Sequence, residues 1–388
     1  MMADNIEHVI SYWVLFQKFH SPALGGFAVL SHWLPFLGFS VSVGALNDRF
    51  DSRRLIQIGM VLFVTVSIGW GYFFLTNSLR VWHAMALLVV HGCAGVFWQT
   101  SSQMLLYDIV GPALLPSAVR LNATARSVGL LVGPAVGGVI MLALGPTRGI
   151  FLDATFYAPL VLWLIGAPYG RTFKGDAPKV RRAVRGFADI TQTIRDVRGV
   201  PVVFAMILLA GAASSFIGNS YQAQMPGFAA DLGHADPGVS YSALLAADAT
   251  GALLAGILLE LRGGNFFKTQ PSSAMKLAML WALSLAGFAW VHWYPGALAL
   301  LFIAGFFELS FSSMAQTVTQ IHAPDGIRGR VLGLFNMSSL GLRALSGITV
   351  GLVGSLMNIH ASLATSALLF VGVTMALLWR LADTQVMA

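Results

Sequence analysis

The segment GALNDRFDSRR, residues 44–54, separates two apolar runs near residues 24–46 and 55–76 that are each long enough to cross a bilayer. Seven of its eleven residues are Asp, Asn, Ser or Arg, so both signs of charge are present. A short group of mixed charges between two such runs is typical of a loop at the surface of a membrane.

The composition of the whole chain supports a membrane location. Of its 388 residues, 56% are hydrophobic and only 10% are charged, whereas soluble domains carry about 25% charged residues. The charged side chains are too few to cover the surface of a protein in water, so most of the surface of this protein must face lipid. We predict an all-α integral membrane protein. A single cysteine, Cys93, excludes an intrachain disulfide framework.

Eleven segments, including the two runs already named, contain enough apolar residues to span the bilayer as helices, which takes about 20 residues each. We predict these helices near residues 24–46, 55–76, 82–107, 119–144, 149–168, 200–223, 241–261, 274–292, 296–320, 331–355 and 360–380.

The first segment, Met1–Phe19, has a shorter apolar run than the other segments. Its apolar part, VISYWVLF, has only eight residues, and Asp4, Glu7 and His8 precede it. Two interpretations remain open: the sequence begins inside a first helix whose start lies upstream, which we favour, or the protein begins with a half-helix. We expect no cleavable signal peptide, because the first residues are acidic and no small-residue cleavage site follows.

Basic residues are distributed unevenly between the two sides of the predicted helices. When the spans alternate across the membrane, starting inside, seventeen of the 23 Lys and Arg residues fall on one side and three on the other. Because basic loops stay in the cytoplasm, we predict that both termini are cytoplasmic, in a bacterial-type inner membrane. The net charge of +7 is then explained by the inner leaflet and not by nucleic acid.

The longest polar interval, residues 169–199, contains eight basic residues and divides the helices six and six. We predict an N-terminal six-helix bundle at residues 1–168, a basic cytoplasmic linker at 169–199 and a C-terminal six-helix bundle at 200–388. Apolar residues at helical spacing in the linker indicate an amphipathic helix on the inner membrane surface, while a flexible linker fits equally well. These apolar residues are Val184, Phe187, Ile190 and Ile194.

The two predicted bundles carry traces of an internal repeat. With an offset of 214 residues, Asn122 aligns with Asn336, and Gly133 aligns with Gly347. Many secondary transporters build a central site from duplicated halves.

The charged loop resembles the loop 2–3 signature of the major facilitator superfamily, G-x-L-a-D-R-x-x-x-R-[RK]. Asp48 places a carboxylate where it can meet the positive N-terminus of a neighbouring helix. In the family this partner is helix 11, which here begins after APDGIRGR, residues 323–330. Such a contact would latch two halves together until they rock apart; a solvated turn is the simpler alternative. The predicted gating-loop residues are Gly44, Asp48, Arg49, Arg53 and Arg54.

A glycine-rich stripe in SVGLLVGPAVGGVI, residues 127–140, resembles the G-x-x-x-G-P-x-x-G-G pattern that this superfamily associates with exporters. Small residues at a spacing of four allow close helix packing in lipid, and a proline can kink the helix. Generic small-residue packing is the alternative. The predicted stripe residues are Arg126, Gly129, Gly133, Pro134, Gly137 and Gly138.

Within the superfamily, SAVRLNATARSVGLLVGPAVGG and IRGRVLGL resemble the branch that contains the enterobactin exporter and macrolide efflux proteins. The resemblance implies two six-helix bundles around one central cavity that opens alternately to each side, without ATP hydrolysis. The sequence itself contains no G-x-x-x-x-G-K-[ST] phosphate loop. We expect no cofactor and no enzymatic activity.

Ionisable residues inside the spans are candidates for function, because charge in lipid is costly. We predict His91, Glu308 and Glu7 as candidate carriers of a coupled proton. His91 replaces the arginine that begins the family's helix 4 signature, and a histidine titrates near pH 6.5, which arginine does not. A hydrogen-bonded interior histidine and a static ion pair of Glu308 with Arg343 are the alternatives.

Other polar and aromatic residues gather on predicted helices 1, 4, 7 and 10, which line the cavity in this family. Their aromatic character suggests an amphipathic ligand such as a drug or a siderophore. The histidines show no metal-ligand spacing, so we expect no metal site. The predicted cavity residues are Tyr12, Trp98, Gln99, Asn219, Tyr221, Gln222, Ser312 and Gln316.

Together these patterns predict a secondary active transporter that exports a small organic molecule in exchange for protons. Two alternatives remain: a non-transporting membrane sensor or scaffold, which the short first segment favours, and a proton-coupled importer. The expected partners are the lipid bilayer, a small-molecule substrate and protons, with no nucleic acid, and the resemblance implies a monomer.

Overall fold

The computed structural model describes residues 1–19, 22–169, 186–218, 220–233, 239–261, 267–346 and 358–386. Helices are the only regular secondary structure in these ranges. This is expected of a chain in lipid, because a helix satisfies its backbone hydrogen bonds within one segment.

The chain forms two compact units that each combine segments from different parts of the sequence. Unit 1 contains Met1–Gly111, Val128–Thr191 and Pro324–Asn336, and unit 2 contains Pro112–Ser127, Gln192–Ala323 and Met337–Ala388. Residues 324–336 therefore pack with the first half of the sequence, and residues 112–127 with the second. The division into bundles at 1–168 and 200–388 stays a prediction.

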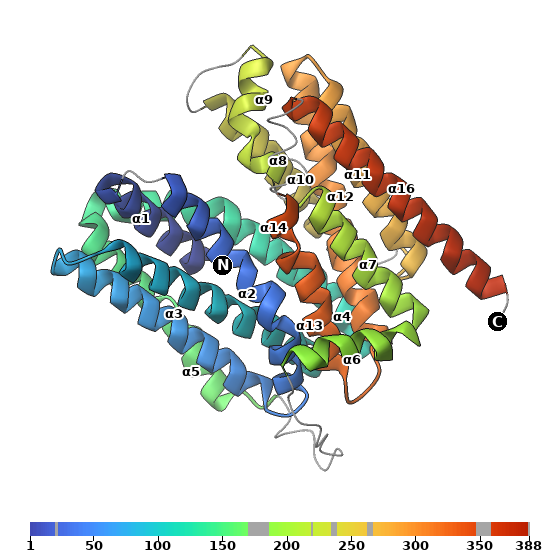
Figure 1. Ribbon diagram of the computed structural model, residues 1–388, viewed down its shortest axis with the longest axis horizontal. Coiled ribbons are helices and arrows are strands. Elements are labelled where there is room, and N and C mark those ends of the chain that lie inside the picture. The colour runs from blue at the N-terminus through green and yellow to red at the C-terminus, as the bar shows by residue number, and fades with distance from the viewer. Residues whose placement is uncertain are drawn as a thin grey trace. The chain divides into compact units, whose positions relative to one another are not determined.

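Unit 1 is built from the N-terminal helices and one short helix from the second half of the sequence. Its apolar core joins α1, α2, α3 and α4 around Ile6, Trp70 and Ile150. In Figure 1, α13 lies along α2 although the two helices are far apart in sequence. The helices of unit 1 are α1 (Met2–Phe19), α2 (Pro22–Asn47), α3 (Ser52–Leu75), two parts of α4 (Val81–Thr155), α5 (Ala158–Gly166), the start of α6 (Phe187–Arg198) and α13 (Arg328–Asn336).

The long helix α4 contains two breaks, at Gly111 (φ 67°) and Gly145 (φ 75°), where the backbone is left-handed. Glycine adopts this conformation without steric cost. The helix predicted at 119–144 therefore begins directly after Gly111, seven residues earlier than expected. The helix predicted at 149–168 is interrupted between α4 and α5.

In unit 2, α12 packs between α10 and α11. Helix α11 also packs against α16, and these two helices lie side by side in Figure 1. Besides residues 112–127 of α4 and the end of α6, its helices are α7 (Pro201–Phe216), α8 (Ser220–Ala223), α9 (Met225–Asp231), α10 (Val239–Leu261), α11 (Pro271–Trp290), α12 (Tyr294–His322), the π-helical turn η2 (Met337–Gly341), α14 (Arg343–Ser346) and α16 (Ile359–Val386).

One predicted span in unit 2 is wrong in its last turns. The continuous helix expected at 200–223 ends at Phe216, and Gly218 follows with a left-handed backbone (φ 53°). The span predicted at 331–355 is described only as far as Ser346, where it consists of α13, η2 and α14. Gly347 of the proposed repeat lies outside the described residues.

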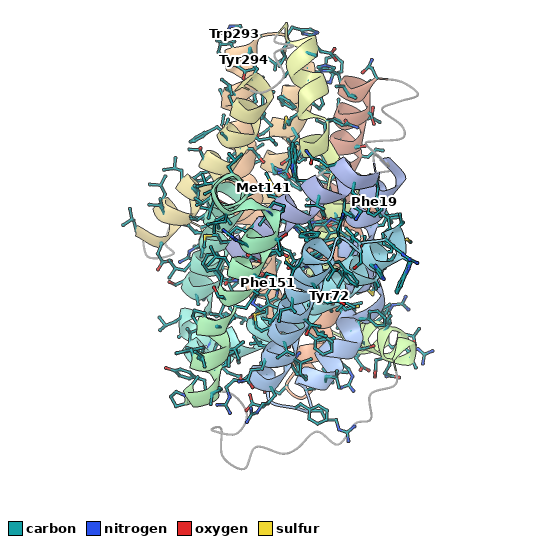
Figure 2. The ribbon with its side chains drawn as sticks, turned by 90° about the vertical axis from the view of Figure 1, so that its left-hand side faces the viewer. Phe19, Tyr72, Met141, Phe151, Trp293 and Tyr294 are labelled. Atoms are coloured by element: carbon teal, nitrogen blue, oxygen red, sulfur yellow. The ribbon has the colours of Figure 1, made fainter. Side chains whose placement is uncertain are left out.

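Seven helices in the described ranges are long and apolar enough to cross a membrane, and Pro201–Phe216 is a shorter apolar helix. Large apolar side chains such as Leu142 and Leu261 are exposed on them, as expected where a surface meets lipid. Figure 2 shows side chains projecting from these helices, with Tyr72 and Phe151 in unit 1, and Trp293 and Tyr294 at the connection from α11 to α12.

The basic linker contains the helix α6, as the amphipathic pattern predicts, whereas residues 170–185, with Val184, lie outside the described residues. The most buried positions of α6 are Asp189, Thr193 and Val197, which follow at intervals of four. Ile190 and Ile194 are half-buried. An acid on the buried face indicates packing against a polar group of the protein.

Candidate transport site

Asp48 follows the last residue of α2 and binds the first turn of α13. Its carboxylate accepts hydrogen bonds from the backbone N–H of Gly329 (2.6 Å) and of Arg330 (3.1 Å). It also pairs with the Arg330 guanidinium, at 3.2 Å between Nη1 and Oδ2. A carboxylate at this position satisfies unpaired donors of the helix and interacts favourably with its dipole. The segment at 323–330 is thus the partner that the loop signature implies; its role as a gate stays a prediction.

Glycine permits the close approach of α2 and α13. A side chain added at Gly44 would meet the backbone carbonyl of Gly329, and one added at Gly329 would meet Gly44 and the Asp48 carboxylate. The same crossing repeats one turn later, where Gly333 lies against the backbone of Ser40 and Val41. The backbones therefore touch along this contact.

Arg330 joins this contact to α6. Its Nε donates to Asp189 Oδ1 at 3.3 Å, while its Nη1 faces Asp48. The arginine side chain is 1% exposed, and the two carboxylates are 4% and 2% exposed. Burial of a charge is tolerable only with such partners, so Arg330 depends on both acids.

The other arginines of the charged loop contact residues nearby in sequence, except that Arg53 also reaches Ala167 after the end of α5. Arg53 pairs with Asp51 (2.8 Å) and donates to the backbone carbonyl of Ala167 (2.6 Å). Arg54 donates to Gln57, and Arg49 lies over the ring of Phe50.

The glycine stripe of α4 faces α1. An added Cβ at Gly133 would lie 2.7 Å from the Cβ of Asn5, and one at Gly137 would lie 3.1 Å from the Cα of Ile6. Gly129 approaches Met1 and Met2 in the same way, whereas Gly138 has open space. Pro134 lies within the helix, and its side chain is outside the description. Close packing is therefore present; the association of this stripe with export stays a prediction.

Two of the three proton-coupling candidates, His91 and Glu7, lie in direct contact in unit 1. His91 Nδ1 is 2.8 Å from Glu7 Oε1, and His91 Nε2 is 2.8 Å from Asp4 Oδ1. The second oxygen of Glu7 lies 2.7 Å from the hydroxyl of Ser67. His91 and Glu7 are 2% and 1% exposed. The imidazole is thus held between two carboxylates from α1.

Further rings surround His91. The ring of His8 lies 4.7 Å from it and that of His32 lies 5.8 Å from it, measured between centroids. Tyr12, a predicted cavity residue, stacks on His8 at 4.9 Å. Phe63 packs edge-on against His91 at 4.8 Å.

The third candidate, Glu308, belongs to a separate polar group in unit 2. It lies in electrostatic range of Arg343 and Arg126, and Asp248 lies in electrostatic range of Glu308. Two predicted cavity residues hold Asp248: Tyr221 Oη donates to it at 3.1 Å and Gln222 Nε2 at 3.0 Å.

The remaining predicted cavity residues are dispersed. Trp98 packs against an apolar cluster of unit 1, and its neighbour Gln99 is half-buried. Ser312 is exposed on α12 and donates to the carbonyl of Leu309, and Gln316 is half-buried one turn further. Asn219 lies outside the described residues.

A second ionic contact, in unit 2, is absent from the sequence-based predictions. Glu260 of α10 accepts hydrogen bonds from Ser117 and from Arg120 (3.2 Å), both on the part of α4 that belongs to unit 2. Residues 140 positions apart form this pair, so no local spacing indicates it. The contact of His32 with His91 is likewise not indicated by any local spacing, because the residues around His91 come from three different helices.

Comparisons with known proteins agree with this architecture. Residues 8–347 match the family described as Major Facilitator Superfamily. The chain is 21% identical to the multidrug efflux pump Tap of Mycolicibacterium fortuitum, over 98% of this chain and 93% of that protein. It is 24% identical to the enterobactin exporter EntS of Shigella boydii serotype 4, over 92% of this chain and 84% of that protein.

The fold also resembles solved transporters. A crystal structure of the E. coli fucose:proton symporter FucP aligns with a TM-score of 0.74 and 11% identity, over 98% of this chain and 96% of that one. These relatives are transporters, and the bacterial exporters among them support a multi-pass protein of the inner membrane. The chain belongs to the major facilitator superfamily.

Proposed function

We propose that this protein is a secondary active transporter that exports a small organic molecule, drug-like or siderophore-like, from the cytoplasm in exchange for protons. The relatives named as a multidrug efflux pump and an enterobactin exporter support export and this substrate class. The close packing of the glycine stripe on α1 supports it as well.

The observation that carries proton exchange is the charged group in unit 2. Glu308 interacts with two arginines, Arg343 and Arg126, and with a second acid, Asp248. Placing an acidic side chain in a membrane span costs free energy, so such a residue is a candidate for a functional role. Protonation of Glu308 removes its attraction to Arg343 and its repulsion of Asp248, so a single proton changes which charges attract one another. Glu308 is therefore the proposed proton carrier, while the roles of His91 and Glu7 in coupling stay predictions.

The contact of Asp48 with α13 is the proposed inner latch. It joins segments from the two halves of the sequence through two backbone hydrogen bonds and one ion pair. Opening toward the cytoplasm breaks all three, and the excess of basic residues on this side supports the cytoplasmic placement of the loop and of both termini.

Transport in everted membrane vesicles tests the proposal. ATP-driven proton pumping acidifies the interior of such vesicles, so an exporter that exchanges protons accumulates its substrate inside them. The two probes are ethidium and iron-free enterobactin. We expect gradient-driven uptake of at least one probe, and its abolition by a protonophore.

The variant Glu308→Gln separates coupling from transport. We expect it to lose gradient-driven uptake and to keep exchange of the same probe across vesicles without a pH gradient. Asp231→Asn, at a carboxylate that is 56% exposed and belongs neither to the Glu308 group nor to the proposed latch, is the matched control and keeps both activities. Full gradient-driven uptake by Glu308→Gln would contradict the assignment, and accumulation only in right-side-out vesicles would indicate an importer.

A further inference from the structure

We propose that Asp4, His8, His32 and His91 form a binding site in unit 1 for a divalent first-row transition-metal ion such as Zn²⁺ or Co²⁺. One ligand atom from each of the four side chains lies within 4.8 Å of all the others. The four residues come from α1, α2 and α4.

The donor set suits this class of ion. Three imidazole nitrogens and one carboxylate oxygen match the ligands of zinc and related metals, and not the all-oxygen shells of Ca²⁺ or Mg²⁺. Four ligand atoms in a tetrahedral shell with bonds of about 2.1 Å lie about 3.4 Å apart. Ligand atoms at the widest separation of 4.8 Å therefore need to close by about 1.4 Å, and the Asp4–His91 pair at 2.8 Å needs to open slightly.

Glu7 orients the histidine that is most buried. Its carboxylate accepts from Nδ1 of His91 at 2.8 Å and is itself anchored by Ser67 at 2.7 Å. A carboxylate behind the imidazole fixes the tautomer and leaves Nε2 to coordinate, as in many metal sites. Nε2 faces Asp4 Oδ1 at 2.8 Å, a contact that requires a proton between two lone pairs. A metal ion takes the place of that proton.

The charge around the cluster also favours a cation. Asp4 and Glu7 place two carboxylates beside the three histidines, and the carboxyl group of Asp153 is completely buried, with no hydrogen-bond partner for either oxygen. A divalent ion lowers the cost of burying this negative charge.

The proposal concerns binding and does not depend on the direction or the cargo of transport. It departs from the sequence-based expectation of no metal site, because only the fold brings His32 and His91 to the Asp4–His8 pair on α1. A bound ion occupies Nε2 of His91, so metal binding and proton coupling through that nitrogen exclude each other.

Cobalt titration of the purified full-length protein tests the site. The protein is purified in detergent through a Strep tag, which adds no histidine, and is treated with a chelator before Co²⁺ is added. We expect one equivalent of Co²⁺ per chain with visible d–d absorption, displaced by Zn²⁺, and a higher melting temperature with either ion.

Variants locate the ion. We expect His8→Gln and His32→Gln each to weaken Co²⁺ binding by more than about tenfold. Even the loss of a residue that only hydrogen-bonds to a metal ligand typically weakens metal binding by about 10- to 100-fold. Both residues are half-buried, and circular dichroism checks that each variant is folded. His292→Gln, at an exposed histidine, is the matched control and binds like the unmodified protein.

Three results would overturn the proposal: folded unmodified protein that binds no Co²⁺, folded His8→Gln and His32→Gln that both bind it unchanged, or a thiolate charge-transfer band that assigns the ion to Cys93. Because the assay measures binding at equilibrium, its failure leaves vesicle transport untouched, and failure of transport leaves the titration interpretable.

Discussion

In unit 1 the carboxylate of Asp48 meets the N-terminus of α13, and in unit 2 the carboxylate of Glu260 meets Arg120 and Ser117 on α4. Both contacts join segments from opposite halves of the sequence. The first is buried, with its ionic partners 4% and 1% exposed. The second is more open, with Glu260 at 32% and Arg120 at 10%.

A glycine marks each crossing, but its neighbour differs. Gly44 lies against the backbone of Gly329, whereas Gly256 of α10 lies against the side chain of Thr124. Backbone cannot move aside, while a side chain can rotate. The contact in unit 1 is thus rigid and dependent on full pairing, and the one in unit 2 tolerates adjustment.

The largest expected effect is that of Asp48→Ala. This change removes the partner of two backbone N–H groups and leaves buried Arg330 with one acid, which costs about 3–5 kcal/mol for a buried pair. Thermal unfolding in detergent measures the loss. Asp325→Ala, at an exposed acid, leaves the melting temperature unchanged. Equal stability of the two variants would show that the Asp48 contact contributes little.

Gly44→Ala comes next. The new methyl group pushes α2 away from α13, and overpacking of this kind costs about 1–3 kcal/mol. Gly138→Ala is the matched control, because nothing lies within 4 Å of its added Cβ and alanine favours helix by up to about 1 kcal/mol. A destabilised control with an unaffected Gly44→Ala would reverse the interpretation of both sites.

Gly256→Ala is expected to cost less, toward the lower end of about 1–3 kcal/mol, because Oγ1 and Cγ2 of Thr124 can rotate away and only its Cβ, 2.8 Å from the added methyl group, requires the helices to shift. The double variant Gly256→Ala/Thr124→Ala recovers part of that loss, since it removes Oγ1 and Cγ2 of Thr124 and keeps only the Cβ that the methyl group meets. Thr124→Ala combined with Gly44→Ala gives no recovery. Additive effects in the first pair, measured by melting temperature, would contradict this geometry.

The smallest effect is expected from Glu260→Gln. A partly exposed ion pair contributes about 0–1 kcal/mol, and salt screens it. We therefore expect a small fall in melting temperature that shrinks further at high salt. A loss as large as that of Asp48→Ala would mean that burial does not distinguish the two contacts.

The sequence predicts the contact of Asp48 with α13 because its signature is local: Gly44 and Asp48 lie within one short segment, and the partner segment is implied by the family. The helix limits in α4 that were predicted wrongly could also have been read from the sequence. Both breaks in α4 are Gly-Pro pairs, Gly111-Pro112 and Gly145-Pro146, and glycine after one helix with proline at the start of the next is a recognised boundary signal.

Other features have no local signal. Arg120 and Glu260 occur in separate spans, and His32 lies among apolar residues of α2. Only the packing of the helices shows which of these polar groups meet. Each helix has several neighbours in a membrane-spanning bundle, so the sequence alone leaves more than one pairing open.

The attachment of Arg330 to Asp189 gives α6 an experimental use. In the proposed transport cycle the Asp48 contact separates, and the surroundings of Arg330 and of its partner Asp189 on α6 are then expected to change. Thr191 is exposed two residues from Asp189, and Cys93 is the only cysteine, so Thr191→Cys in a Cys93→Ser background accepts one fluorophore. A change in its emission on addition of substrate would report the proposed movement as an optical signal, without a label inside the membrane.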